Sequence, residues 1–219
     1  MVVNDKLYFY LGCLSASSIT IPLIIGVFLI RKMPKNTLIL FSLIVLSLIS
    51  EVSGYVLLKC NLYNLFVFRL YTIAQLILLS FFYISIISSH KAKWFMKISI
   101  FIFLAIAFAD AYKSGLNSLD DLSLSTSSFL LIIYSLLTFY DIIKNPVHLN
   151  VLSLPLFWFN TAVLSYFSGC LFLFIFSNYL KNHYAKSFHV LWGINSILNI
   201  TFNLLIATGF WKTRHRQIS

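Results

Sequence analysis

Long runs of apolar residues, each containing few charges, follow one another along the chain. A transmembrane helix needs about 20 consecutive, mostly apolar residues. We predict spans at about residues 7–30, 37–58, 63–88, 94–111, 122–142, 151–180 and 187–211. The pattern therefore predicts an all-α fold, a polytopic membrane bundle of seven transmembrane helices that forms a single domain over residues 1–219.

The amino-acid composition indicates that most of the surface of the folded protein faces lipid and not water. Hydrophobic residues make up 60% of the chain and charged residues 10%, whereas a soluble domain has about 45–50% and about 25%. This apolar excess is too large for a buried core, because a soluble globule also needs a polar coat. We therefore expect a multi-pass protein of the cell (cytoplasmic) membrane.

The basic residues predict the orientation of the bundle, because cytoplasmic loops carry an excess of lysine and arginine. If the N-terminus is outside, the cytoplasmic set is Arg31, Lys32, Lys35, Lys91, Lys93, Lys97, Lys144, Lys212, Arg214 and Arg216. The external set is then only Lys6, Lys59, Lys113, Lys181 and Lys186. We predict an external N-terminus and a cytoplasmic C-terminus. The net charge of +10 then points to anionic lipid as a partner, and not to nucleic acid.

Two charged residues, Glu51 and Arg69, lie well away from the ends of the predicted spans. A charge at the centre of a membrane helix costs roughly 2.5–3.5 kcal/mol on insertion scales, so each needs a reason. Counting from the loop between spans two and three places both at nearly the same depth on neighbouring helices. We predict an ion pair between them, either as a clamp alone or with one member also meeting a ligand, an ion or a proton.

A ladder of asparagines occupies the last span. Asn195, Asn199 and Asn203 recur every four residues and therefore share one face of a helix. One interpretation is interhelical hydrogen bonding worth about 0.6 kcal/mol per contact. The alternative is that the ladder lines a polar pathway.

Several of these polar residues reach a similar depth in the external half of the bundle. Tyr71 is nearly level with Glu51, Gln75 lies closer to the midplane, and serines are frequent in the first span. We predict an outward-facing polar pocket between spans one, two, three and seven. Its candidate ligand-binding residues are Glu51, Arg69, Tyr71, Gln75, Asn195 and Asn199.

Signatures of catalysis and metal binding are missing from the sequence. The five histidines have no ligand spacing, and no Gly-x-Ser-x-Gly motif is present. The cysteines have neither metal spacing nor an even count, although a bridge from Cys13 to Cys60 or Cys170 is an alternative. We predict no catalytic residue, no metal and no cofactor.

Two segments resemble a poorly characterised group of small seven-helix bacterial membrane proteins. They are the hairpin that carries Glu51 and Arg69-Leu70-Tyr71, and the run Pro155-Leu156-Phe157-Trp158-Phe159-Asn160. The resemblance implies a seven-helix membrane bundle and brings no activity with it. Some bacterial sensor proteins use a similar seven-helix module as their membrane part.

The leading hypothesis is a non-enzymatic membrane sensor or signal-coupling module. It would bind a small-molecule ligand in the external pocket and contact a cytoplasmic or membrane protein partner. The alternative is a small transporter or channel subunit with an asparagine-lined pathway, and an intramembrane enzyme comes third. A polar tunnel that reaches both faces would favour transport, whereas a cavity closed in its inner half would favour sensing.

Overall fold

The structure of the chain is a computed structural model, which describes residues 2–115, 121–144, 150–183 and 185–215. Within these ranges, the side chains of residues 2–6, 121, 174, 176–183, 185–189 and 215 lie outside the description. The helices are α1 Val2–Ser18, α2 Thr20–Leu29, α3 Lys35–Lys59, α4 Leu65–Ile86, α5 His90–Ser114, α6 Asp121–Lys144, α7 Pro155–His183 and α8 Ala185–His215. Two short 3-10 helices, Ile30–Lys32 and Val151–Ser153, precede α3 and α7, and the described residues contain no strand.

In the part of the chain that the structure describes, seven helical segments are long and apolar enough to cross a membrane. The first, Leu7–Lys32, combines α1, α2 and the 3-10 turn, and each of α3 to α8 contains one more. The all-α class is confirmed, and the seven helical segments fit the seven predicted spans in length and apolar composition. Helix α5, which corresponds to the fourth predicted span, is longer than the predicted range 94–111. The residues of His90–Lys93 continue the helix beyond the apolar run.

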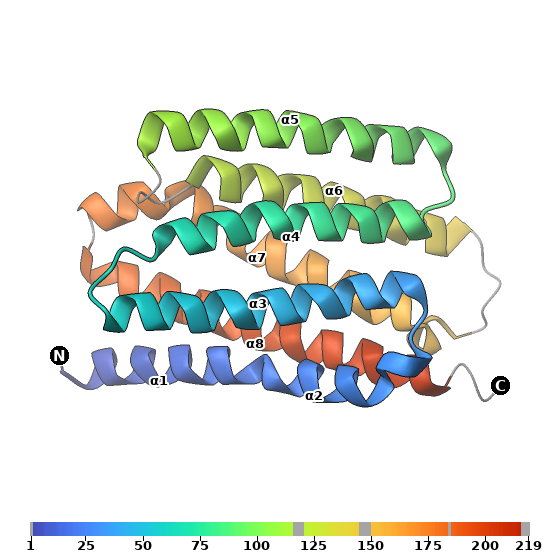
Figure 1. Ribbon diagram of the computed structural model, residues 1–219, viewed down its shortest axis with the longest axis horizontal. Helices are drawn as coiled ribbons and strands as arrows, with labels where there is room; N and C mark the ends of the chain where they lie inside the picture. Colours follow the sequence, from blue (N-terminus) through green and yellow to red (C-terminus); the bar gives the residue numbers. More distant parts are fainter. Residues whose placement is uncertain (1, 116–120, 145–149, 184, 216–219) are drawn as a thin grey trace.

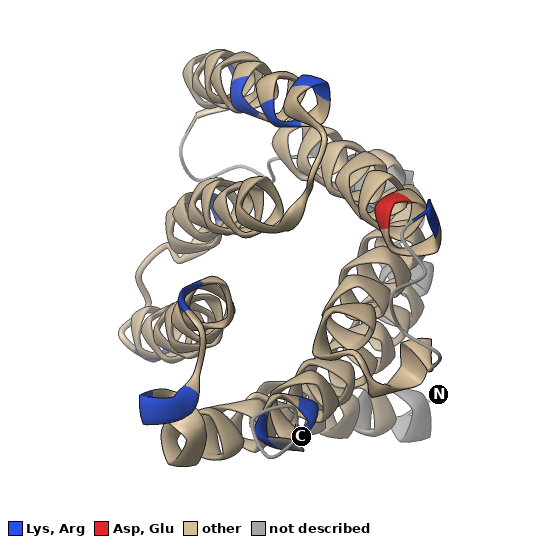
Figure 2. Ribbon diagram, turned by 90° about the vertical axis from the view of Figure 1, so that its right-hand side faces the viewer, with Lys and Arg blue, Asp and Glu red and all other residues tan. Residues whose placement is uncertain are grey.

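The seven segments lie side by side and alternate in direction (Figure 1). The N-terminus, the α3–α4 corner and the α7–α8 corner share one end, called here the N-terminal end, and the C-terminus lies at the opposite, C-terminal end (Figure 1). Viewed along the helices, α1/α2, α3, α4, α6, α7 and α8 form a ring (Figure 2). Helix α5 packs outside this ring against α4 and α6.

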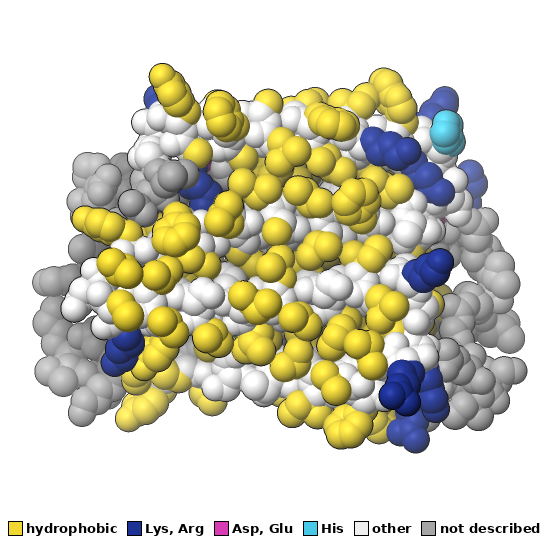
Figure 3. Space-filling view, viewed as in Figure 1, with side chains coloured by type: hydrophobic (Ala, Val, Ile, Leu, Met, Phe, Trp, Pro, Cys, Tyr) yellow, Lys and Arg dark blue, Asp and Glu magenta, His cyan; other side chains and the backbone are white. Residues whose placement is uncertain are grey.

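The outward faces of the helices are largely apolar. Phe28, Phe101 and Phe108 are 82%, 73% and 76% exposed, and hydrophobic side chains spread over the face seen in Figure 3 while lysine and arginine gather at its ends. Patches of this extent are rare on soluble monomers. They match the surface of a multi-pass membrane protein whose outward side chains face lipid.

Four phenylalanines, Phe41, Phe82, Phe159 and Phe210, form an aromatic layer near the C-terminal end. All are at most 8% exposed, and Phe159 contacts Phe82 and Phe210 edge-to-face with ring centroids 6.2 and 5.5 Å apart. Gly209 makes this packing possible, because a Cβ atom there would lie 2.2 Å from the Phe159 ring. The layer joins α3, α4, α7 and α8 across the interior.

Candidate functional site

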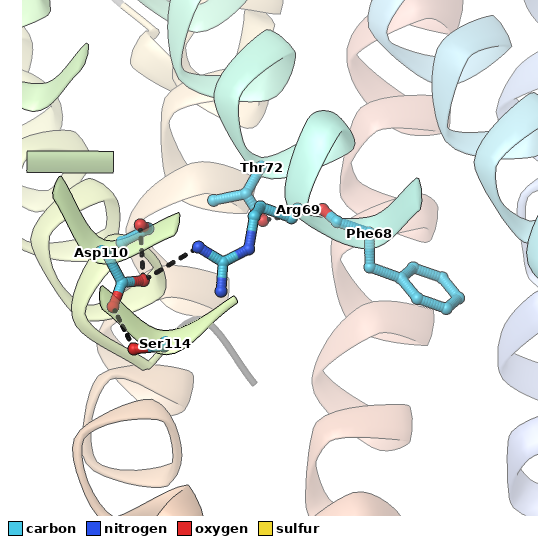
Figure 4. A network of polar contacts seen from close by, with 6 residues as sticks. Phe68, Arg69, Thr72, Asp110 and Ser114 are labelled. Carbon is cyan, nitrogen blue, oxygen red and sulfur yellow. Dashed lines mark hydrogen bonds and ion pairs between the residues drawn. The ribbon is translucent and has the colours of Figure 1, made fainter. Parts of the chain in front are cut away.

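The predicted ion pair between Glu51 and Arg69 is wrong. Arg69 is buried and donates from Nη1 to Oδ2 of Asp110 on α5, at 3.3 Å (Figure 4). The same carboxylate accepts hydrogen bonds from Ser123 at 3.2 Å and from Ser114 at 3.3 Å. This network therefore ties α4, α5 and α6 together at the N-terminal end of the bundle.

Depth explains why Asp110 is the partner. Arg69 lies four residues from the start of α4 and Asp110 four residues from the end of α5, so both are about 6 Å inside the same end at the usual rise. Glu51 lies eight residues from the end of α3, at about twice that depth. Sequence reasoning missed Asp110 because it falls at the edge of the predicted span 94–111, where an acidic side chain was expected to meet the membrane interface.

The helices form a cavity of about 530 Å³, which is open to the surface at the C-terminal end, and one of about 410 Å³. The smaller one, called here the Glu51 cavity, opens among α1, α3, α4, α7 and α8 in the half of the bundle toward the N-terminal end. Its polar lining residues are Ser15, Ser47, Ser50, Glu51, Asn64, Tyr71, Thr72, Gln75, Tyr166, Asn195, Ser196 and Asn199.

The structure brings together five of the six candidate ligand-binding residues around this cavity. Tyr71 and Gln75 line it from α4, Asn195 and Asn199 line it from α8, and Glu51 lines it from α3. Arg69 is absent from the lining because its side chain points to Asp110 (Figure 4). That these five residues bind a ligand stays a prediction.

Glu51 is the half-buried acidic group of the cavity wall. Among the residues that the structure describes, its carboxylate has no ion pair and no hydrogen bond. Tyr71 and Tyr166 line the same cavity. No lysine, arginine or histidine belongs to the described lining, so an ionised Glu51 would leave the cavity with one uncompensated negative charge.

The other polar groups of the wall are held in place by their neighbours. Gln75 donates to the Tyr71 hydroxyl at 3.1 Å. On the opposite wall, the Asn195 side-chain oxygen accepts from the Cys170 thiol at 3.1 Å and from the Tyr166 hydroxyl at 3.5 Å. These bonds orient two amides and two phenols at the cavity surface, where a ligand can reach them.

The asparagine ladder faces the interior, and its members differ in role. Asn199 donates to Ser15 at 2.9 Å, and Asn203 donates to Ser18 at 2.7 Å. The prediction of interhelical hydrogen bonds is therefore confirmed for α8 and α1. Asn195 and Asn199 also line the cavity, whereas Asn203 is buried outside the lining.

Between Asn199 and the C-terminal end, the interior of the bundle is packed with apolar side chains. Leu40, Leu76 and Leu79 are at most 1% exposed, and the aromatic layer lies beyond them toward the C-terminal end. The larger cavity follows on the far side of that layer and is called here the Arg31 cavity. Its lining includes Arg31, Lys32, Asn36, Thr37, Phe82 and Phe159, and no residue is shared with the Glu51 cavity.

A buried polar cluster between α4, α6 and α7 was not predicted as a unit. Asn160 accepts from the Tyr83 hydroxyl at 2.9 Å and from the Ser135 hydroxyl at 2.8 Å, and it donates to the Ser135 carbonyl at 3.0 Å. All three residues are fully buried. The signal in the sequence was an asparagine within an apolar span, which must find partners.

The described residues offer no metal cluster to set beside the cavities. No group of three histidine, cysteine or acidic residues able to hold a metal occurs among them. The three cysteines are free, so the alternative of a bridge from Cys13 is wrong. The side chains of His148, His183, His189 and His215 lie outside the described residues.

Comparison with known proteins adds no relative. No family model matches the chain, and neither a curated protein nor a solved structure matches it.

Proposed function

We propose that this chain is a sensory or signal-coupling protein of the cell membrane that binds a small molecule in the Glu51 cavity and has no enzymatic activity. The observation that carries the proposal is the cavity itself. It has about 410 Å³ of space and converging polar side chains inside an otherwise apolar bundle, and ligand sites typically measure about 300–1,000 Å³. Packed residues close it toward the C-terminal end, which favours sensing over passage.

The orientation follows from the distribution of basic residues. Among the described basic side chains, Lys59 and Lys113 lie in the last turns of α3 and α5, at the N-terminal end. The described basic residues at the other end are Arg31, Lys32, Lys35, Lys91, Lys93, Lys97, Lys144, Lys212 and Arg214. Under the positive-inside rule this distribution supports a cytoplasmic C-terminal end and an external Glu51 cavity.

Coupling to the cytoplasm would pass through the C-terminal end. The basic groups there suit anionic lipid headgroups or an acidic surface of a protein partner. Occupancy of the Glu51 cavity would change the packing of α8, because α8 contributes Asn195 and Asn199 to the cavity wall and Phe210 to the aromatic layer. One helix thus joins the external site to the cytoplasmic surface.

A ligand screen with a cavity-filling variant tests the proposal. Ser47 lines the cavity from α3, whereas Ser42 is exposed on the same helix. We expect compounds of a small-molecule library to raise the melting temperature of the wild-type protein and of Ser42→Phe, but not of Ser47→Phe. A screen that finds no stabilising compound, or one in which Ser47→Phe responds like the wild type, contradicts the proposal.

The Arg31 cavity supports a second candidate, a small transporter. Two cavities on opposite sides of a packed layer are what a carrier needs if the layer can open and close. The compounds found in the screen distinguish the two functions when they are added to proteoliposomes. Saturable uptake into the vesicles would favour transport, whereas binding without uptake would favour sensing.

A further inference from the structure

We infer that the Glu51 cavity selects small organic cations, in which an ammonium group is joined to an apolar body. This inference rests on the proposed function, since it names the chemical class of the molecule that the cavity would bind. The juxtaposition of one carboxylate with several aromatic side chains carries it.

The charge of the cavity points to a cation. Glu51 is the acidic side chain of the described lining, and that lining contains no basic residue. Arg69, the nearby buried cation of α4, is engaged with Asp110 and turned away (Figure 4). A carboxylate in a partly desolvated cavity is stabilised when a counter-ion approaches it, and a bound ammonium would supply that counter-ion.

The aromatic lining fits the same ligand. Phe68, Tyr71, Tyr166, Phe167 and Trp192 line the cavity. The faces of aromatic rings attract ammonium groups, and rings around an acidic residue are a recurring way to bind amines. Because these rings come from α4, α7 and α8, they can surround a ligand that is held by Glu51 on α3.

Other ligand classes fit less well. An anion would meet the Glu51 carboxylate and no described positive group of the lining. A small metal ion needs several oxygen ligands at close range, and the described residues hold no such acidic or histidine cluster. The apolar floor formed by Leu43, Ile44 and Phe202 suits a hydrocarbon portion of the ligand.

Three probes of one carbon frame test the sign of the charge: phenethylammonium, the neutral 2-phenylethanol and the anionic phenylacetate. Their binding is measured by equilibrium dialysis against the full chain in nanodiscs of zwitterionic phosphatidylcholine, so that lipid charge does not attract the cation. We expect phenethylammonium to bind at least about tenfold tighter than either analogue, as expected of a desolvated charge and ring contact.

The variants assign this preference to Glu51. Glu51→Gln should weaken phenethylammonium binding at least about tenfold and leave 2-phenylethanol binding unchanged. Asp141→Asn is the matched control, because Asp141 lies near the C-terminal end, where its carboxylate accepts from the Ser88 amide at 2.8 Å. This variant should bind all three probes like the wild type.

Each remaining result overturns the inference. Absence of saturable phenethylammonium binding, equal binding of the three probes, a preference for phenylacetate, or an unchanged cation affinity in Glu51→Gln would each do so. If one of the analogues binds and Ser47→Phe abolishes that binding, the cavity is a ligand site of another class. In that case the proposed function stands while the assignment of a cation fails.

Discussion

Arg69 and Glu51 show two different fates of a charged side chain in this bundle. Arg69 is buried, is paired with Asp110, and shares that carboxylate with two serine hydroxyls. Glu51 faces a cavity without a described partner. Removing one member of a buried ion pair strongly destabilises a fold, because the other charge is left buried without a partner. The first residue is therefore expected to serve stability, and the second to serve binding.

Replacing Arg69 by methionine should destabilise the protein. The change leaves the Asp110 carboxylate, whose side chain is 10% exposed, without its cation, and breaking a buried pair in this way costs about 3–5 kcal/mol. The measurement is thermal unfolding in detergent. Adding Asp110→Asn to Arg69→Met should restore part of the loss, because the stranded charge is removed.

Glu51→Gln is the contrasting variant for the same measurement. It should leave the melting temperature of the protein close to that of the wild type, because no described ion pair or hydrogen bond is lost. A loss as large as that of Arg69→Met would show instead that Glu51 holds the fold together, as the original pairing with Arg69 implied.

The sequence predicts which polar residues turn inward better than it predicts their partners. Helical spacing and depth were enough to gather Glu51, Tyr71, Gln75, Asn195 and Asn199 around one cavity. Arg69 was misassigned because a helix presents different faces to different neighbours, and the rotation of α4 that turns Arg69 toward α5 depends on packing. Counting depth from both ends of each helix would have brought Asp110 into consideration.

At the scale of elements, α8 holds the bundle together through alternating small, polar and aromatic contacts. Asn199 and Asn203 bind serines of α1, and Gly209 lets α8 approach Phe159 of α7 closely. In lipid the hydrophobic effect does not drive helices together, so such close packing and interhelical hydrogen bonds take its place. Substitutions in α8 should therefore change stability according to the helix that they face.

A double-mutant cycle on Asn203 and Ser18 should detect their hydrogen bond. Asn203→Leu and Ser18→Ala are combined, and the coupling free energy is expected to be about 0.6 kcal/mol and no more than about 1.7 kcal/mol. Thr201→Ala serves as the control, since its hydroxyl is bonded within α8 to the Ile197 carbonyl and should show no coupling to Ser18. A zero coupling for Asn203 would contradict the contact.

Gly209→Ala should destabilise the protein by about 1–3 kcal/mol, the usual cost of overpacking. The added methyl group would lie 2.2 Å from the Phe159 ring, which is itself packed on both sides. Gly12→Ala is the matched control, because nothing lies within 4 Å of its Cβ position. That variant should be neutral or more stable by up to about 1 kcal/mol, as alanine favours a helix; the reverse ranking would contradict the packing.

Helix positions were predictable because the length of an apolar run is a local property, whereas the lateral order of helices is not. The run in α5 predicts a span, but it does not indicate that α5 lies outside the ring while α6 closes it. The start of α7 differs from the predicted start at residue 151, because Val151–Ser153 forms a separate 3-10 helix. The helix begins at Pro155, and proline is well suited to the first position of a helix.

For the whole molecule, the central feature is the aromatic layer that separates the Glu51 cavity from the Arg31 cavity among the described residues. The Glu51 cavity gathers acidic, amide and phenol groups, and the Arg31 cavity has basic residues at its wall. This difference follows the basic bias of the C-terminal end. A ligand in the first cavity and a cytoplasmic partner at the second would communicate through α8 and the packed layer that it enters.

Cysteine accessibility in intact cells tests this division most directly. In a chain with Cys13, Cys60 and Cys170 replaced by serine, single cysteines are placed at Asn195 and Asn203 and treated with a membrane-impermeant thiol reagent from outside. We predict modification of Asn195→Cys, which lines the cavity, and protection of Asn203→Cys, which is 2% exposed. Equal modification of both positions, or protection of Asn195→Cys from outside, would contradict an external cavity that closes before Asn203.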